Sequence, residues 1–424
     1  MREALKARLL SKSYYKWLLV VLLYFVAALN YGDRTALSAL FPLLRKDLGM
    51  SDVALAAVGT TFLWTYGLVS PLAGYLGDRF SRSTLIGWSL VAWSLVTAFT
   101  GLVQTSQQLL GMRVLLGLAE ALYIPTSAAL IADFQSTESR ARANAIHLTG
   151  VFSGVVAGST ISGYIGDRYG WRPSTWVLGG AGLVVAAACY FLLFDKPRQP
   201  ATPAGEREQH NVAPPPLKAV ADILRVPSYL FLAGQVMLMS LGSWMFSNWM
   251  PLFFAERFKM GLAGAGFSAT LALQAGNVLG ILGGGFVSDR VARGHLKRRM
   301  LVQACCNIVA APFLLAFLWS GDFAVITASI FLYSLLRASG AANENPVLCD
   351  VLNDRQRATA IGISNLTSTL MGGVGILIAG YLKSDLGLGA VFAGVSVIVA
   401  LSGVLLLVGY RFFLEKDLRR QLTA

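Results

Sequence analysis

Long apolar stretches separated by short polar connections make up most of the chain. Each stretch holds about 20 or more mostly apolar residues, enough for a helix to cross a hydrocarbon core of roughly 30 Å. The stretches are continuous rather than alternating, so they predict helices and exclude the strands of a β-barrel. The predicted spans are 17–41, 53–76, 83–103, 107–132, 143–165, 173–194, 227–254, 264–288, 300–319, 323–350, 358–382 and 388–412.

Composition and charge support an all-α membrane protein with twelve transmembrane helices. Hydrophobic residues make up 55% of the 424 residues and charged residues only 13%, whereas soluble domains carry about 25% charged residues. Most of the 35 lysines and arginines lie in segments that share one side with the N-terminus, which predicts that both termini are cytoplasmic. The net charge of +13 therefore indicates topology and contact with anionic membrane lipids, not nucleic-acid binding.

A polar, proline-rich stretch divides the predicted spans into two sets of six. It predicts an N-terminal bundle over 1–194, an extended cytoplasmic linker over 195–226 and a C-terminal bundle over 227–424. The two halves share a repeat: the pattern G-x-x-x-D-R-x-x-R occurs from Gly74 to Arg82 and again from Gly285 to Arg293. Two pseudo-symmetric halves are therefore expected.

This loop pattern and the six-plus-six arrangement resemble the major facilitator superfamily from about Lys16 to Arg411. The resemblance implies transport by alternating access in the cell's inner (plasma) membrane, by a functional monomer without cofactor. An aspartate at a helix end can accept backbone N–H groups of a neighbouring helix and pair with arginine. We therefore expect gating residues in both copies of the pattern, namely Asp78, Arg79, Arg82, Asp289 and Arg290; the alternative is a topology signal alone.

Three pairs of ionisable residues lie inside predicted spans, where charges are costly and usually mark an ion or substrate path. We expect Asp33 and Glu120 to carry a coupling proton. Arg34 and Arg113 would alternate between pairing with these acids and facing an anionic substrate. The alternative is a buried ion network that only holds the helices in register.

The second half carries Arg337 and Glu344 in its tenth predicted apolar stretch. Aligning the halves on Asp133 and Asp350 makes Arg337 the counterpart of Glu120. Arg337 could bind a substrate carboxylate in a bidentate manner or form a salt bridge to Glu344 or Glu120. Glu344 is expected to act as an inner gate, and a polar pocket is expected from Trp244, Asn248, Gln274, Asn277 and Asn343.

Two shorter motifs narrow the resemblance. The segments from Asn30 to Ser38 and from Arg113 to Ala121 look like signatures of the anion:cation symporter family, and spinster-type lipid carriers share both. The first resemblance implies proton-coupled symport of a small organic anion such as a sugar acid. The alternative is a spinster-like, proton-linked lysolipid or sphingolipid transporter. We expect no enzyme activity and no metal site, since neither a nucleophile–base constellation nor metal-ligand spacing is visible.

Overall fold

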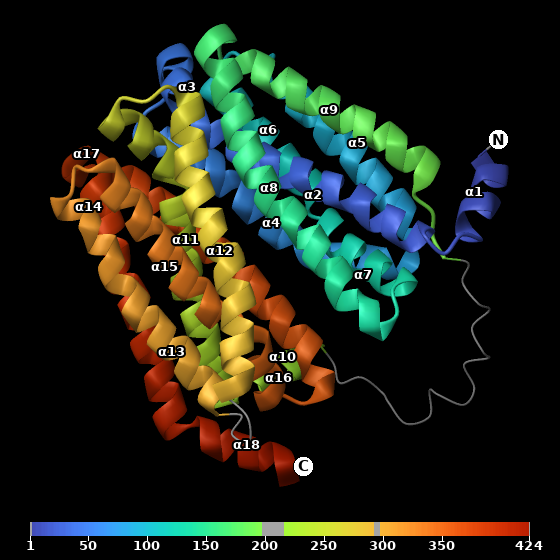
Figure 1. Ribbon diagram of the computed structural model, residues 1–424, viewed down its shortest axis with the longest axis vertical. Helices are drawn as coiled ribbons and strands as arrows, with labels where there is room; N and C mark the ends of the chain where they lie inside the picture. Colours follow the sequence, from blue (N-terminus) through green and yellow to red (C-terminus); the bar gives the residue numbers. More distant parts are fainter. Residues whose placement is uncertain (1, 197–215, 292–296, 424) are drawn as a thin grey trace.

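The computed structural model describes residues 2–196, 216–291 and 297–423, apart from some side chains within these ranges, and the regular structure there is helical (Figure 1). Eleven of the helical stretches are long and apolar enough to cross a membrane. The helices are α1 (Arg2–Leu10), α2 (Tyr15–Ala39), α3 (Phe41–Leu48), α4 (Asp52–Arg79), α5 (Arg82–Thr100), α6 (Ser106–Glu120), α7 (Tyr123–Phe134), α8 (Thr137–Tyr169), α9 (Trp171–Leu192), α10 (Pro216–Leu224), α11 (Pro227–Phe258), α12 (Leu262–Val291), α13 (Arg298–Ala310), the 3-10 helix η2 (Ala311–Leu315), α14 (Ala316–Trp319), α15 (Phe323–Ala341), α16 (Glu344–Val351), α17 (Asp354–Phe412) and α18 (Leu414–Thr423).

Helix starts follow from local side chains. Ser51 accepts the Ala54 N–H at the start of α4, and Thr105 accepts the Gln108 N–H at the start of α6. Each hydroxyl satisfies one of the backbone donors that a helix leaves unpaired in its first turn. The boundaries of the apolar stretches are therefore set by capping residues in the polar connections.

Two predicted spans are each broken near their middle, where α6 gives way to α7 and α15 to α16. Pro125 and Pro346 explain both breaks, because a proline ring clashes with the carbonyl four residues earlier. Those carbonyls belong to Ala121 and Ala342, which lie at the breaks. The breaks place Glu120 at the last residue of α6 and Glu344 at the first residue of α16.

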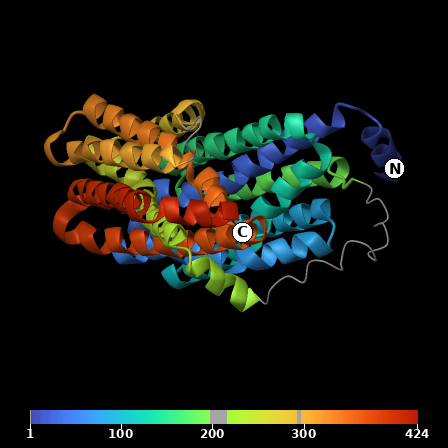
Figure 2. The same ribbon diagram turned by 90° about the horizontal axis from the view of Figure 1, so that it is seen from below.

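The helices form two bundles, α1–α9 and α10–α18 (Figures 1 and 2). Within the first bundle α2 packs on α8, and the backbones are close enough that a Cβ on Gly158 would lie 2.3 Å from the Gly32 Cα. Between the bundles, α4 packs on α17 and α8 on α12. Small residues at such contacts permit the tight packing that stabilises membrane helices.

The bundles meet at the end opposite the chain termini and diverge towards the end that holds both termini (Figure 1). Contacts between α4 and α17 illustrate this, since Thr60 donates to the Gly373 carbonyl (2.9 Å) and Trp64 to the Leu370 carbonyl (3.0 Å). Beyond this level, Leu68 and Leu72 of α4 are exposed. The arrangement is that of a two-bundle protein closed at one end.

Two features differ from simple expectation. The last part of the predicted extended linker is helix α10, while 197–215 lie outside the described residues. The last two predicted spans both fall within α17, which has a kink at Gly387 with φ 73° and ψ 157°. Glycine is suited to this backbone conformation because it has no Cβ to clash.

Candidate functional site

A buried ion pair lies at the centre of the first bundle. Arg34 of α2 donates through Nε to Glu120 Oε2 of α6 at 2.9 Å, and through an Nη to Asn30 Oδ1 at 2.9 Å. The guanidinium also lies over the rings of Tyr31 and Tyr66, 4.5 Å from each centroid. Arg34 is therefore held by a carboxylate, an amide and two aromatic faces, which together replace its hydration.

The pair is not fully satisfied. Glu120 is 0% exposed, and neither its Oε1 nor the Asn30 Nδ2 has a hydrogen-bond partner among the described atoms. Buried polar atoms normally find partners, so an unpaired carboxylate oxygen in the membrane interior marks a position that can accept a proton.

Asp33 and Arg113 lie in the same region without forming an ion pair. Thr97 donates to Asp33 Oδ2 at 3.1 Å, while Asp33 Oδ1 is buried without a partner. Arg113 donates to the Val58 carbonyl at 3.2 Å and lies 4.9 Å from the Phe62 ring centroid. In this conformation the predicted pairing is therefore present for Arg34 with Glu120, while Asp33 and Arg113 have neutral hydrogen-bond partners.

Arg337 occupies a different environment in the second bundle. Its Nη2 donates to Asn277 Oδ1 at 2.9 Å, and Asn277 in turn donates to Gln274 Oε1 at 3.1 Å. Among the described residues no carboxylate lies within 4.0 Å of Arg337, which is only half-buried. The salt bridge considered as an alternative, to Glu344 or Glu120, is therefore absent from this conformation, and the Asn277 amide of α12 accepts a hydrogen bond from the arginine instead.

Glu344 begins α16, and Gln235 of α11 donates to its Oε1 at 3.5 Å. Gln303 donates to the Gln235 side chain at 3.2 Å, so two amides extend from the carboxylate into the bundle. A cavity of about 50 Å³ adjoins Glu344 and is lined also by Asn345 and Asn365.

The remaining predicted pocket residues are spread over several contacts. Asn343 accepts a hydrogen bond from Ser288 of α12. Trp244 packs against Gly372 of α17, where an added Cβ would lie 2.4 Å from the indole. Asn248 lies at the junction of the bundles, since a Cβ on Gly59 would be 2.8 Å from its Oδ1.

The predicted gate at the ends of α4 and α12 is described only in part. Arg82 pairs with Asp133 and donates to the Ala129 carbonyl at 3.3 Å, all within the first bundle. Arg79 and Arg290 are exposed. The side chains of Asp78 and Asp289 lie outside the described part of the chain.

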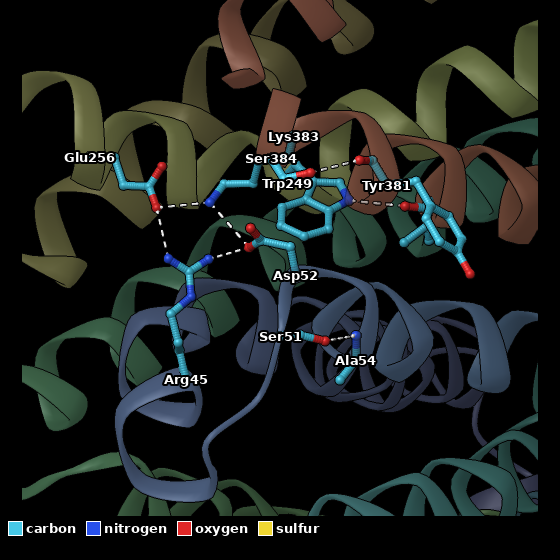
Figure 3. Close-up of polar contacts among 10 residues, drawn as sticks. Arg45, Ser51, Asp52, Ala54, Trp249, Glu256, Tyr381, Lys383 and Ser384 are labelled. Carbon is cyan, nitrogen blue, oxygen red and sulfur yellow. Dashed lines mark hydrogen bonds and ion pairs between the residues drawn. The ribbon is translucent and has the colours of Figure 1, made fainter. Parts of the chain in front are cut away.

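Four charged residues join the bundles at the closed end (Figure 3). Lys383 of α17 contacts Asp52 at 3.1 Å and Glu256 at 3.2 Å. Arg45 of α3 pairs with the same two acids, at 3.4 Å from Glu256. Because each cation bridges an acid of the first bundle and one of the second, this closed-end charge network links the bundles.

Helix α3, which carries Arg45, is itself anchored within the first bundle. Trp171 Nε1 donates to Asp47 Oδ2 at 2.9 Å, and Arg172 pairs with the same oxygen. These hydrogen bonds lower the pKa of Asp47 below its usual value. The anchor fixes the position from which Arg45 reaches the second bundle.

The sequence alone revealed neither the closed-end charge network nor several partners of the buried charges. Asn30 lies one helical turn before Arg34, a spacing that puts both side chains on one face. Tyr66, Thr97 and Gln235 come from other helices. No spacing along one helix could have revealed them.

A crevice of about 610 Å³ lies between α8 and α12, on the side of the bundle contact. Its walls are mostly apolar and include Phe152, Val156, Phe267 and Leu271, with Gln274 among the few polar residues. The Gln274 amide that accepts from Asn277 therefore lies at the edge of an apolar groove.

Comparison with known proteins gives a consistent result. Residues 23–304 and 274–422 match the model of the Major Facilitator Superfamily. The chain is 25% identical to the probable galactarate/D-glucarate transporter GudP of Bacillus subtilis (strain 168), over 94% of this chain and 93% of that protein. It is 29% identical to human protein spinster homolog 1, over 84% of this chain and 71% of that protein.

The fold is similar to that of a bacterial homolog of the human lysosomal transporter spinster in an inward-facing, unoccupied conformation. The TM-score is 0.74 at 18% identity, covering 96% of this chain and 98% of that one. The helical architecture and the matched segments together identify a multi-pass membrane transporter rather than an enzyme. The chain belongs to the Major Facilitator Superfamily.

Proposed function

We propose that this protein is a proton-coupled symporter of a small organic anion, such as a sugar acid. The observation that carries the proposal is the environment of Arg337, a guanidinium within a membrane-spanning stretch that contacts an amide and no carboxylate. A cation in that position is costly unless an anion compensates it. A guanidinium also matches a carboxylate in a bidentate geometry.

The proposed coupling uses the pair formed by Arg34 and Glu120. A proton on the free Oε1 of Glu120 would remove the charge that holds Arg34 and leave the arginine available to an anion. Asp33, whose Oδ1 is also unpartnered, is the second proposed proton carrier. Proton occupancy would thereby favour substrate binding or the change of conformation, because it changes which charges are compensated.

The proposal includes a topology of twelve spans with both termini in the cytoplasm. It also places the protein in the plasma membrane as a monomer. The kink at Gly387 supports twelve spans, because α17 at 59 residues is far longer than a bilayer crossing and divides there into two. With this topology the closed-end charge network faces outwards, and the described conformation is open to the inside.

The relatives support a sugar acid as the substrate, since galactarate and D-glucarate are small polyhydroxylated anions. Their hydroxyls suit the amides near Arg337, which are those of Gln274 and Asn277. The second candidate is a lysolipid, and the apolar crevice between α8 and α12 is the observation that favours it.

Uptake into proteoliposomes distinguishes the two candidates. The purified protein is reconstituted, an inward proton gradient is imposed, and uptake of labelled sugar acids is compared with uptake of lysolipids. Accumulation of a sugar acid that collapses when a protonophore is added supports the proposal. Accumulation of a lysolipid alone would establish the second candidate. Sugar-acid uptake at the same rate with and without the proton gradient would refute proton coupling.

The coupling role is tested in the same vesicles with Glu120→Gln. The amide keeps the side-chain shape but cannot release a proton, so we expect gradient-driven accumulation to be lost while counterflow exchange persists. The matched control is Glu138→Gln at an exposed position at the start of α8. Persistent accumulation by the Glu120 variant would exclude Glu120 as the proton carrier.

A further inference from the structure

The loop pattern at the end of α4 has a close copy at the opposite end of the molecule. Gly163-Tyr-Ile-Gly-Asp167-Arg168 repeats Gly74-Tyr-Leu-Gly-Asp78-Arg79, with isoleucine in place of leucine as the single difference. The first copy ends α4 near the chain termini, whereas this copy ends α8 at the closed end. Asp78 is expected to accept backbone N–H groups of a neighbouring helix, and Asp167 occupies the same place in the copied pattern.

Asp167 makes that contact across the two bundles. Its Oδ1 accepts the Leu262 N–H at 2.9 Å and its Oδ2 accepts the Ala263 N–H at 3.1 Å. These are the first two residues of α12, whose N–H groups have no partner within the helix. A carboxylate also interacts favourably with the positive end of a helix dipole. Helix α12 thus receives its N-terminal cap from the other half of the protein.

The segment before α12 provides no side-chain cap of its own. Lys259, Met260 and Gly261 precede the helix, and none has the short oxygen-bearing side chain that caps helices. Other side-chain caps come from the same bundle as the helix that they cap. Asp322 accepts the Val325 N–H of α15 at 3.0 Å, while Asp195 accepts the Ser83 N–H of α5 and Asp417 the Ser228 N–H of α11, each at 2.9 Å. The cap from Asp167 is therefore a contact between bundles, and it depends on their distance.

Glycines on both sides allow this approach. A Cβ on Gly163 would lie 2.5 Å from the Leu262 carbonyl group, and one on Gly261 would lie 3.0 Å from Asp167 Oδ2. One turn further along, a Cβ on Gly266 would lie 2.8 Å from the Ser159 carbonyl oxygen. The backbones of α8 and α12 are thus in direct contact at this end, and any separation of the two helices must break both hydrogen bonds of the cap.

We propose that Asp167 is a positioning residue for transport, which caps α12 only while the outer side is closed. Helix α12 also carries Asn277, which accepts from Arg337, and Gln274, which accepts from Asn277. The cap therefore fixes the helix that positions the proposed substrate arginine in the inward-facing state. This inference rests on the proposed function for the role of Arg337, but the cap itself can be tested without substrate.

The test measures access to the contact between α8 and α12. In a background with the four cysteines replaced by serine, Ser159→Cys places a reporter at a fully buried position facing Gly266. We expect Asp167→Ala to raise the rate of labelling by a membrane-impermeant maleimide, added from the outside, by about fivefold, since lost helix caps are commonly worth about 1 kcal/mol. Asp167→Asn keeps one acceptor oxygen and should give a smaller increase.

Asp322→Ala is the matched control, because it removes an aspartate cap from the same end of the molecule without touching the bundle contact. It should leave the labelling rate unchanged. Equal labelling in wild type and Asp167→Ala, or an equal rise in the control, would overturn the proposal. If the Asp167→Ala protein cannot be produced in folded form, Asp167→Asn takes its place in the same comparison.

Transport adds a second readout. For a sugar acid presented from the inner side, Asp167→Ala should raise KM several-fold while Asp322→Ala leaves it unchanged. A labelling change without a KM change would refute the link to Arg337. If Asp167→Ala changes labelling but the wild type transports no anion at all, the inference about the cap stands and the proposed function is refuted.

Discussion

Arg337 and Arg34 both lie in the membrane interior, but their replacement should have different effects. Replacing Arg337 should weaken substrate binding, and replacing Arg34 should lower stability. Arg34 neutralises a fully buried carboxylate, whereas Arg337 contacts an amide and has no carboxylate within 4.0 Å among the described residues. Removing one partner of a buried ion pair commonly costs about 3–5 kcal/mol. Arg337 has Asn277 as its hydrogen-bond partner and forms no ion pair within 4.0 Å among the described residues, so removing it should cost less stability.

The magnitude for Arg337→Ala follows from its free donors. One of the five N–H groups is used on Asn277, which leaves four, and a bidentate carboxylate needs two of them. Hydrogen bonds to charged groups contribute about 1.5–3 kcal/mol each. Losing two therefore weakens binding by at least about 3 kcal/mol, which is about 100-fold in Kd. Arg337→Lys keeps the charge but not the fork and should lose about tenfold.

Binding of a labelled sugar acid to purified protein, combined with thermal unfolding, tests this reasoning. We expect Arg337→Ala to bind about 100-fold more weakly without a lower Tm, and Arg34→Ala to unfold at a lower Tm. A neutral analogue without carboxylates should bind wild type and Arg337→Ala alike, and Arg411→Ala serves as a control at an exposed position. An unchanged Kd for Arg337→Ala would refute its role, and a lower Tm would show that it stabilises the fold instead.

Three other outcomes are expected. Lys383→Ala removes a cation that bridges an acid of each bundle, so outward-facing molecules should become several-fold more populated. Spin-label distances across the closed end measure this population, and an unchanged distribution would show that Lys383 does not stabilise the closed end. Gly158→Leu should prevent folding, measured as loss of the monodisperse peak, since even a Cβ would clash with Gly32, while Gly180→Ala has open space and should behave as wild type. Uptake of a monoanion with one proton should be independent of an imposed membrane potential, and a potential-driven rate would contradict that stoichiometry.

Much of the fold could be predicted because helix formation in a bilayer depends on local apolar content. Most predicted spans coincide with observed helices, while the last two share α17, and the broken span at Pro346 follows from a residue visible in the sequence. The helix α10 was missed since its apolar face is short and follows a run of prolines. Two apolar segments follow each other closely around Gly387, and their sequence does not determine the residue at which the first helix ends.

The site could be predicted as a set of residues but not as a set of contacts. The sequence identified Arg34, Glu120 and Arg337 as charges inside the membrane, because such charges are rare. It left the partner of Arg337 open, since distances between helices depend on how the helices pack. The structure shows Asn277, from a helix 60 residues away.

The charges of the membrane interior suggest why a proton and an anion would move together. Away from the ends of the predicted spans lie three arginines and three acids, so the membrane interior is neutral when all are ionised. Each proton taken up by an acid leaves one positive charge in excess, and each carboxylate of a substrate removes one. The loaded carrier is neutral again when protons and substrate charges are equal in number, which is the condition under which the bundles can rearrange with the lowest electrostatic cost. A dicarboxylate would then require two protons, and the members of this balance are Asp33, Arg34, Arg113, Glu120, Arg337 and Glu344.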